Sequence, residues 1–293
     1  MKSALLLAAF ALQSLAAGTA HAQAPQAALT IVAAEDFYGN VARRLAGPDA
    51  TITSILHSPD QDPHLFEASP SVARSLSRAR IVVYNGLDYD PWMPRLLEAA
   101  KAPDRRVVVV ADVLHRKTGD NPHLWYAPAN MAAAARAMAA AMAATDPAGT
   151  AGYDQRLRAF LDSLGPVEAR MALIRRLYPA APVTATEPVF GPMAAALGLD
   201  MRNERFQLAV MNGTEPRVSD VAAFEADLRQ HRVRVLFYNI QASDPAAKRL
   251  RDIAEAAGIP VVGVTETEPG GTDYPAWMLR QLDDVDAALR HAP

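Results

Sequence analysis

Short apolar runs of strand length alternate along the chain with longer segments of helical periodicity. This alternation limits the possible folds more than any other feature of the sequence. It is the pattern of a parallel sheet with helices packed on its faces. The sequence therefore predicts an α/β fold. The predicted strands are 29–33, 51–56, 81–84, 107–110, 183–185, 208–211, 233–238 and 261–264. The predicted helices are 37–45, 70–78, 92–100, 129–144, 153–177, 189–197, 221–229, 246–257 and 274–289.

The helix expected over 153–177 is the longest of these segments, and it lies between two regions that each have α/β patterning. Gly165-Pro166 should kink it, because proline removes one backbone hydrogen bond from a helix interior. We expect it to act as a rigid connector between two lobes, each a mainly parallel sheet flanked by helices. The predicted division of the chain is a signal peptide (1–22), a first lobe (23–148), a connecting helix (149–178) and a second lobe (179–293).

The first 22 residues have the features of an export signal. Lys2 precedes an apolar run from Ala4 to Ala17, and Ala20-His21-Ala22 has the small-x-small pattern of a cleavage site. The apolar run is too short to span a bilayer, and no later segment is suited to do so. The sequence therefore predicts an exported protein with no transmembrane segment in its mature chain.

Charge and cysteine content exclude several functional classes. The formal net charge is −3 at pH 7 and no block of lysine or arginine occurs, so neither nucleic acid nor an anionic membrane surface is an expected partner. The chain has no cysteine. This excludes structural disulfides, thiolate metal sites and a lipid-modified N-terminal cysteine.

Two histidines occur in nearly the same local sequence, each directly after a proline. His64 lies in Asp62-Pro63-His64-Leu65-Phe66-Glu67 and His123 in Asp120-Asn121-Pro122-His123-Leu124-Trp125. Because the chain has only seven histidines, this repetition favours a shared role as metal ligands over two unrelated surface histidines. The other five, at positions 21, 57, 115, 231 and 291, are expected at the surface or in the signal. For His57 the alternative is a contact with one of the metal ligands.

Acidic residues follow two predicted strands of the second lobe, at the edge where open α/β sheets bind ligands. Glu187 precedes Pro188, which can open a helix, so Glu187 is either a ligand or a carboxylate that stabilises that helix end. Glu266 and Glu268 both follow the strand predicted at 261–264. The local sequence leaves open which of these two acids, if either, is a ligand.

Together these segments resemble the zinc/manganese-type substrate-binding proteins of bacterial ABC importers, the ZnuA-like family. The resemblance rests on the motifs around His64 and His123 and spans essentially the whole mature chain. It extends to Phe190-Gly191, Asn85-Gly86-Leu87 and Trp277-Met278. It implies two lobes joined by one long helix, with a metal ion bound in the cleft by His64, His123, Glu187 and Glu266. The last assignment departs from the usual Asp, and the His- and Asp-rich loop of many zinc-specific relatives is missing.

The function implied is capture of one divalent transition-metal ion, either zinc or manganese, with iron(II) also compatible, and its delivery to the membrane permease of an ABC importer. The protein would be a periplasmic monomer and not an enzyme. Asn85, Asp62 and Tyr238 are candidates to orient the imidazoles.

One alternative is a binding protein for an organic solute or a metal chelate. Its cleft would be lined by four aromatic residues, Phe66, Trp125, Phe190 and Tyr238. A second is a metal-dependent hydrolase, although the sequence has no His-Glu-x-x-His helix, no Gly-x-Ser-x-Gly elbow and no P-loop. A third is a surface adhesin.

Overall fold

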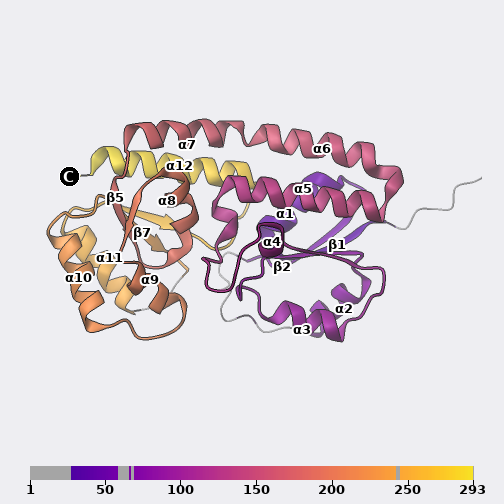
Figure 1. The fold of residues 1–293 in the computed structure, drawn as a ribbon, viewed down its shortest axis with the longest axis horizontal. Helices are drawn as coiled ribbons and strands as arrows, with labels where there is room; N and C mark the ends of the chain where they lie inside the picture. The colour runs from indigo at the N-terminus through magenta and orange to yellow at the C-terminus, as the bar shows by residue number, and fades with distance from the viewer. Residues whose placement is uncertain (1–27, 59–65, 67–68, 242–244, 293) are drawn as a thin grey trace, which may run out of the picture.

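Two parallel four-stranded sheets form the framework of the computed structural model, which describes residues 28–58, 66, 69–241 and 245–292 (Figure 1). The first sheet has the order β2-β1-β3-β4 and the second the order β6-β5-β7-β8. The strands are β1 (Thr30–Glu35), β2 (Thr51–Leu56), β3 (Ile81–Tyr84), β4 (Arg106–Val109), β5 (Pro182–Ala185), β6 (Asp200–Arg202), β7 (Leu236–Asn239) and β8 (Val261–Val264). The predicted fold class is confirmed. The predicted signal, residues 1–22, lies outside the described residues.

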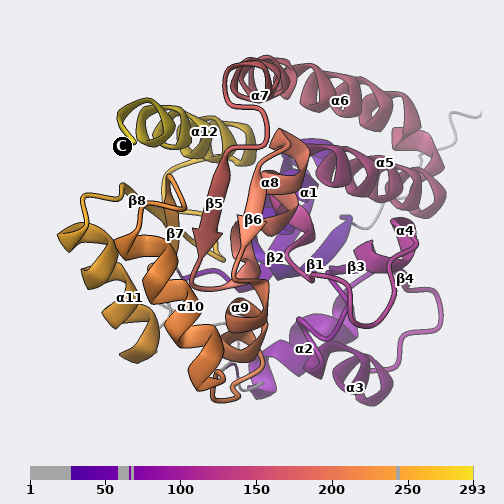
Figure 2. The ribbon, with the colours of Figure 1, turned by 60° about the vertical axis from the view of Figure 1, so that its left-hand side comes forward.

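Helices cover both faces of each sheet (Figures 1 and 2). In the first lobe, α1 (Asp36–Ala46) and α5 (Pro128–Thr145) lie on one face, and α2 (Pro70–Arg78) and α3 (Trp92–Ala99) lie on the other. In the second, α8 (Gly191–Leu197) and α12 (Tyr274–His291) lie opposite α9 (Glu204–Met211), α10 (Val218–Arg229) and α11 (Pro245–Ala256). The short helix α4 (Val110–Val113) follows β4. The sheet faces are apolar because buried strand residues such as Ile31 and Val83 alternate sides with Val32 and Val82.

The connection between the lobes is made by α6 (Thr150–Ser163) and α7 (Gly165–Leu177), which run across both lobes at the top of Figure 1. The helix predicted over 153–177 is therefore two helices that meet at Leu164. Pro166 explains the break, since it has no N–H to donate to the preceding turn. The lobe limits proposed at 148–149 and 178–179 stay predictions.

One of the apolar cores extends through both lobes. Its aromatic part begins with Trp125, which stacks on Phe37 at a ring-centroid distance of 4.4 Å. Tyr126 meets Phe190 at 5.7 Å, and Phe190 stacks on Phe237 of the second sheet at 4.1 Å. Wide opening of the lobes would expose this apolar surface to water, at a free-energy cost of about 25 cal/mol for each Å². The structure therefore favours small movements at the cleft.

One predicted strand is wrong. The apolar run Leu208–Met211 forms the last turn of α9, in which Phe206 and Gln207 are buried while Leu208 is 43% exposed. The run therefore has the one-sided burial of a surface helix and not that of a core strand. The strand beside β5 is instead β6, which was not predicted. It has only three residues, two of them charged and exposed, as an edge strand allows, so its sequence lacks an apolar signal.

Candidate metal site

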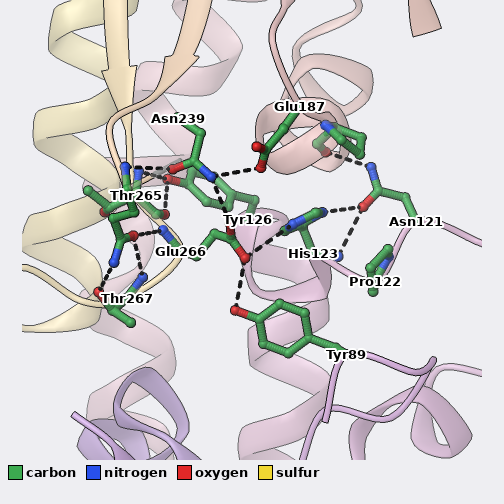
Figure 3. Close-up of polar contacts among 12 residues, drawn as sticks. Tyr89, Asn121, Pro122, His123, Tyr126, Glu187, Asn239, Thr265, Glu266 and Thr267 are labelled. Carbon is green, nitrogen blue, oxygen red and sulfur yellow. Dashed lines mark hydrogen bonds and ion pairs between the residues drawn. The ribbon is translucent and has the colours of Figure 1, made fainter. Parts of the chain in front are cut away.

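Polar side chains from both lobes meet at the carboxyl ends of the second sheet (Figure 3). Glu187 follows β5, Asn239 ends β7 and Glu266 comes two residues after β8. These strands are neighbours and parallel, so their carboxyl ends lie at one edge. The first lobe adds His123, from the segment between α4 and α5, and Tyr89, from the segment between β3 and α3.

His123 is fully buried, and its ring is held in one orientation by Asn121. The Asn121 Oδ1 accepts hydrogen bonds from the backbone N–H of His123 at 3.0 Å and from the ring Nδ1 at 2.8 Å. Because a carboxamide oxygen only accepts, Nδ1 is the donor in this hydrogen bond, and the tautomer with its proton on Nδ1 has its lone pair on Nε2. Within the described part of the chain, the buried Nε2 has no hydrogen-bond partner. This nitrogen is therefore suited to bind a metal ion.

Glu266 lies directly opposite this nitrogen. Its Oε2 is 3.7 Å from His123 Nε2 and accepts a 3.1 Å hydrogen bond from the Tyr89 hydroxyl. Burial and the charges of Glu266 and Glu35 raise the pKa of Tyr89 well above its ordinary value, so the phenol stays a donor. Typical zinc–nitrogen and zinc–oxygen bonds of about 2.0–2.2 Å place two ligand atoms roughly 3–3.7 Å apart. The observed separation is compatible with an ion between them.

Glu187 is linked to Glu266 by the side chain of Asn239, which is hydrogen-bonded to both acids. The Asn239 Nδ2 donates to Glu187 Oε2 at 2.8 Å and to Glu266 Oε1 at 2.7 Å. All three side chains are almost fully buried, with Glu187 the most exposed at 6%. The carboxylate that follows β5 therefore faces the cleft, and it does not cap the helical turn after it by a side-chain bond.

The described residues contain no group of three or more His, Asp or Glu side chains close enough to hold a metal ion by themselves. They do bring His123 and Glu266 together, with Glu187 one amide group away (Figure 3). His64, the remaining predicted ligand, lies outside the described residues.

The loop that carries Glu266 is fixed from both sides. The Tyr126 hydroxyl of the first lobe donates to the Thr265 carbonyl at 2.7 Å and accepts from the Thr265 N–H at 3.2 Å. From the second lobe, the Gln241 Oε1 accepts the N–H groups of Glu266 and Thr267. The position of the carboxylate is thus set by backbone contacts as well as by its own hydrogen bonds.

Glu268 lies elsewhere. It lines a separate cavity of about 420 Å³ together with Asp36 and His57, and its backbone N–H donates to Asp36 Oδ1 at 3.1 Å. Burial, followed by the charges of Asp36 and Asp273, raises the pKa of Glu268 to about 8. Of the two acids that the sequence left open, Glu266 is the one beside His123.

The three residues expected to orient the imidazoles differ in what the structure shows for them. The Asn85 Nδ2 donates to the carbonyl of Pro122 at 2.8 Å, one peptide before His123, so it supports the loop that carries His123. Tyr238 contacts Arg251 instead, with the guanidinium 5.2 Å from the ring centroid. Asp62 lies outside the described residues. The sequence reasoning missed Asn121, Asn239 and Tyr89, although Asn121 lies within the motif of His123.

The aromatic residues proposed for an organic-solute cleft belong to the core. Trp125 and Phe190 are fully buried, Tyr238 is 6% exposed and Phe66 packs against Trp92. A cavity of about 650 Å³ does lie between the lobes beside Asn121 and Pro188, but none of the four aromatic residues lines it. This arrangement opposes the organic-solute alternative.

The loop of His123 is hydrogen-bonded to the second lobe at a point where a side chain larger than that of glycine would displace Asn121. Asn121 Nδ2 donates to the carbonyl of Pro188 at 2.7 Å, and a Cβ on Gly191 would lie 2.7 Å from that nitrogen. We expect Gly191→Ala to push Asn121 away, to misorient the His123 ring and to lower zinc affinity about 10-fold, within the range for loss of an outer-shell partner. Isothermal titration calorimetry with zinc measures the change.

Gly165→Ala is the matched control, because an added Cβ there meets nothing within 4 Å and Gly165 also begins a helix. That variant should keep wild-type affinity. Wild-type zinc affinity in Gly191→Ala would show that the contact between Asn121 and Pro188 does not orient His123.

Comparisons with known proteins agree with this fold. The family model described as "Zinc-uptake complex component A periplasmic" matches residues 31–288. The manganese ABC transporter substrate-binding lipoprotein PsaA of Streptococcus anginosus is 23% identical, covering 97% of this chain and 96% of the relative. The metal ABC transporter substrate-binding lipoprotein SloC of Streptococcus mutans is also 23% identical, covering 98% of each chain.

Solved structures share the architecture. The periplasmic zinc-binding protein TroA of Treponema pallidum superposes with a TM-score of 0.76 at 20% identity, covering 89% of this chain and 99% of that one. The Mn-bound periplasmic metal-binding protein of Candidatus Liberibacter asiaticus gives a TM-score of 0.74 at 17% identity, with the same coverage. At these identities the structural likeness establishes the fold.

Proposed function

Because the chain belongs to the family of periplasmic zinc-uptake complex component A, we propose that it captures one divalent transition-metal ion between its lobes and delivers the ion to the permease of an ABC importer. The observation that carries this proposal is the buried Nε2 of His123, which lacks a hydrogen-bond partner in the described structure and lies 3.7 Å from a carboxylate oxygen of Glu266. A buried ring nitrogen of this kind is costly unless a ligand occupies it.

The proposed ligands are His64 and His123 from the first lobe and Glu187 and Glu266 from the second. His64 is assigned from its Pro-His motif alone. Two imidazoles and two carboxylates without a thiolate suit zinc, manganese or iron(II), and the general affinity order favours zinc over manganese. The names of relatives include both a zinc-binding and several manganese-transporting proteins.

Four protein ligands around one ion leave no open position for an activated water, which is what a hydrolytic metal site keeps. We therefore propose a carrier and not an enzyme. The proposed location is the periplasm, and the proposed working form is a monomer whose cleft faces the permease. None of the helices in the described ranges is long and apolar enough to cross a membrane.

Native mass spectrometry with elemental analysis tests the proposal on residues 23–293 after treatment with a chelator. Zinc and manganese are offered separately and then together. We expect one tightly held ion per chain, with the competition ranking the two metals. A chain that holds no stoichiometric ion under any of these conditions would overturn the proposal.

The two acids after β8 provide a paired prediction. Glu266→Gln should weaken zinc binding at least about 10-fold, because an uncharged amide replaces a carboxylate beside His123. Glu268→Gln should bind zinc as tightly as the wild type, since Glu268 lines a different cavity. Calorimetric titration of both variants decides between them, and the reverse ranking would move the fourth ligand to Glu268.

A further inference from the structure

Asn239 lies between two acidic side chains at one edge of the second sheet. It ends β7, which lies between β5 and β8 in the sheet order. Glu187 follows one of these neighbouring strands and Glu266 the other. Because the strands are parallel, a side chain at the end of β7 lies between the two carboxylates (Figure 3).

A single carboxamide serves both acids. The Asn239 Nδ2 has two hydrogens, and it donates at 2.8 Å to Glu187 Oε2 and at 2.7 Å to Glu266 Oε1. The orientation of the amide is fixed by its other end, since Asn239 Oδ1 accepts the backbone N–H of Gln241 at 3.1 Å. If the amide were rotated by 180°, its NH2 group would face the N–H of Gln241, and two donors cannot form a hydrogen bond. Asn239 is 1% exposed, so water does not replace these bonds.

We propose that Asn239 is a positioning and selectivity residue that holds one oxygen of Glu187 and one oxygen of Glu266, so that each carboxylate offers a single oxygen to the metal. This inference rests on the metal-capture function proposed above. One oxygen from each acid together with two imidazoles makes a four-coordinate site, which zinc prefers. Manganese prefers six ligands, largely oxygens, and gains when a carboxylate binds through both of its oxygens.

The burial of the two acids supports the same role. Glu187 and Glu266 are 6% and 1% exposed, and a buried carboxyl group is costly unless it is hydrogen-bonded. The shared N–H groups of Asn239 are favourable to both carboxylates. They keep the acids at a fixed spacing before the ion arrives, so less ordering is needed on binding.

Asn239→Ala tests the proposal in the full mature chain, with zinc and manganese affinities measured by calorimetry or chelator competition. We expect zinc affinity to fall about 10- to 100-fold, the usual effect of losing an outer-shell partner. Manganese affinity should fall less, so the zinc-to-manganese ratio of affinities drops. Asn212→Ala is the control, because Asn212 is an exposed asparagine at the end of α9 in the same lobe; both affinities should stay unchanged there.

Affinities of Asn239→Ala within twofold of the wild type would overturn the positioning role. Equal losses for both metals would overturn the selectivity role. A general loss of packing would also fail to change the ratio, so the ratio separates the proposal from a merely structural effect.

A second measurement needs no metal. In the metal-free protein, Asn239→Ala should lower the Tm, because it leaves the two acids without their shared donor. The fall should be smaller when Glu187→Gln is also present, since the new amide can donate to Glu266. An equal fall in both backgrounds would overturn the inference. If the wild type bound no metal, the proposed function would fail, and this measurement would still decide whether Asn239 positions the acids.

Discussion

Replacing His123 with alanine is expected to reduce zinc affinity by more than the roughly 100-fold that marks the upper range for outer-shell changes. The substitution removes a ligand atom, whereas those changes only misplace one. It also removes the ring that packs against Tyr89 and that Asn121 orients, so the Asn121 Oδ1 has no ring to hold. Calorimetric titration of the chelator-stripped variant measures the loss, and manganese should follow the same direction.

His291→Ala is the matched control for this experiment. His291 is exposed in the last turn of α12, on a regular helix. His115 and His231 are less suitable, because both have positive φ and alanine would add backbone strain. Far-UV circular dichroism of the metal-free His123→Ala protein separates a lost ligand from a lost fold. A folded variant with wild-type affinity would contradict the site.

The sequence predicted most strands of the two sheets because each of them contains buried apolar residues. Strands 51–56, 81–84 and 261–264 coincide with β2, β3 and β8, in which β-branched residues such as Ile55, Val82 and Val262 are buried. The start of the helix over Pro70–Arg78 was likewise predicted from the proline at its first position. β6 could not be recognised, since an exposed edge strand of three residues leaves no apolar pattern.

The candidate site was predictable only in part. A repeated Pro-His segment predicted His123, and the resemblance to a known family predicted Glu187 and Glu266. The structure places Glu266, and not Glu268, beside His123. Asn239 carries no signal in the sequence. Its role comes from the order of the strands, which places the end of β7 between two acids from segments roughly 80 residues apart. Such a relation is a property of topology and not of local composition.

Metal-free protein is expected to lose stability as the pH rises from about 5 to 8. Burial raises the pKa of Asp36 and of Asp90 to about 6 and that of Glu268 to about 8, and it raises the pKa of Glu35 well above its ordinary value. Between its ordinary and its raised pKa, each group binds more protons in the folded than in the unfolded chain. The free energy of unfolding therefore falls with rising pH over that interval.

Glu268→Gln isolates one of these groups. The amide has the shape of the protonated acid and does not titrate, so the variant should become more stable than the wild type as the pH rises through this range. The difference should reach the order of 2–3 kcal/mol near pH 8. Urea unfolding of the metal-free proteins at pH 5, 6, 7 and 8 measures it. Glu98→Gln, at an exposed position of α3, is the control; a difference that stays constant with pH for Glu268→Gln would refute the prediction.

Metal binding should have the opposite pH dependence, because the ligands bind as neutral imidazole and ionised carboxylate. Raising the pH therefore weakens the metal-free fold and strengthens its hold on the ion. The increase in Tm on adding zinc should grow from pH 5 to pH 8, because stabilisation by a ligand that binds only the folded chain increases with its affinity. Because the buried acids Glu35 and Glu268 weaken the metal-free fold as the pH rises, the stability of this protein should depend most on its cargo at neutral and mildly alkaline pH.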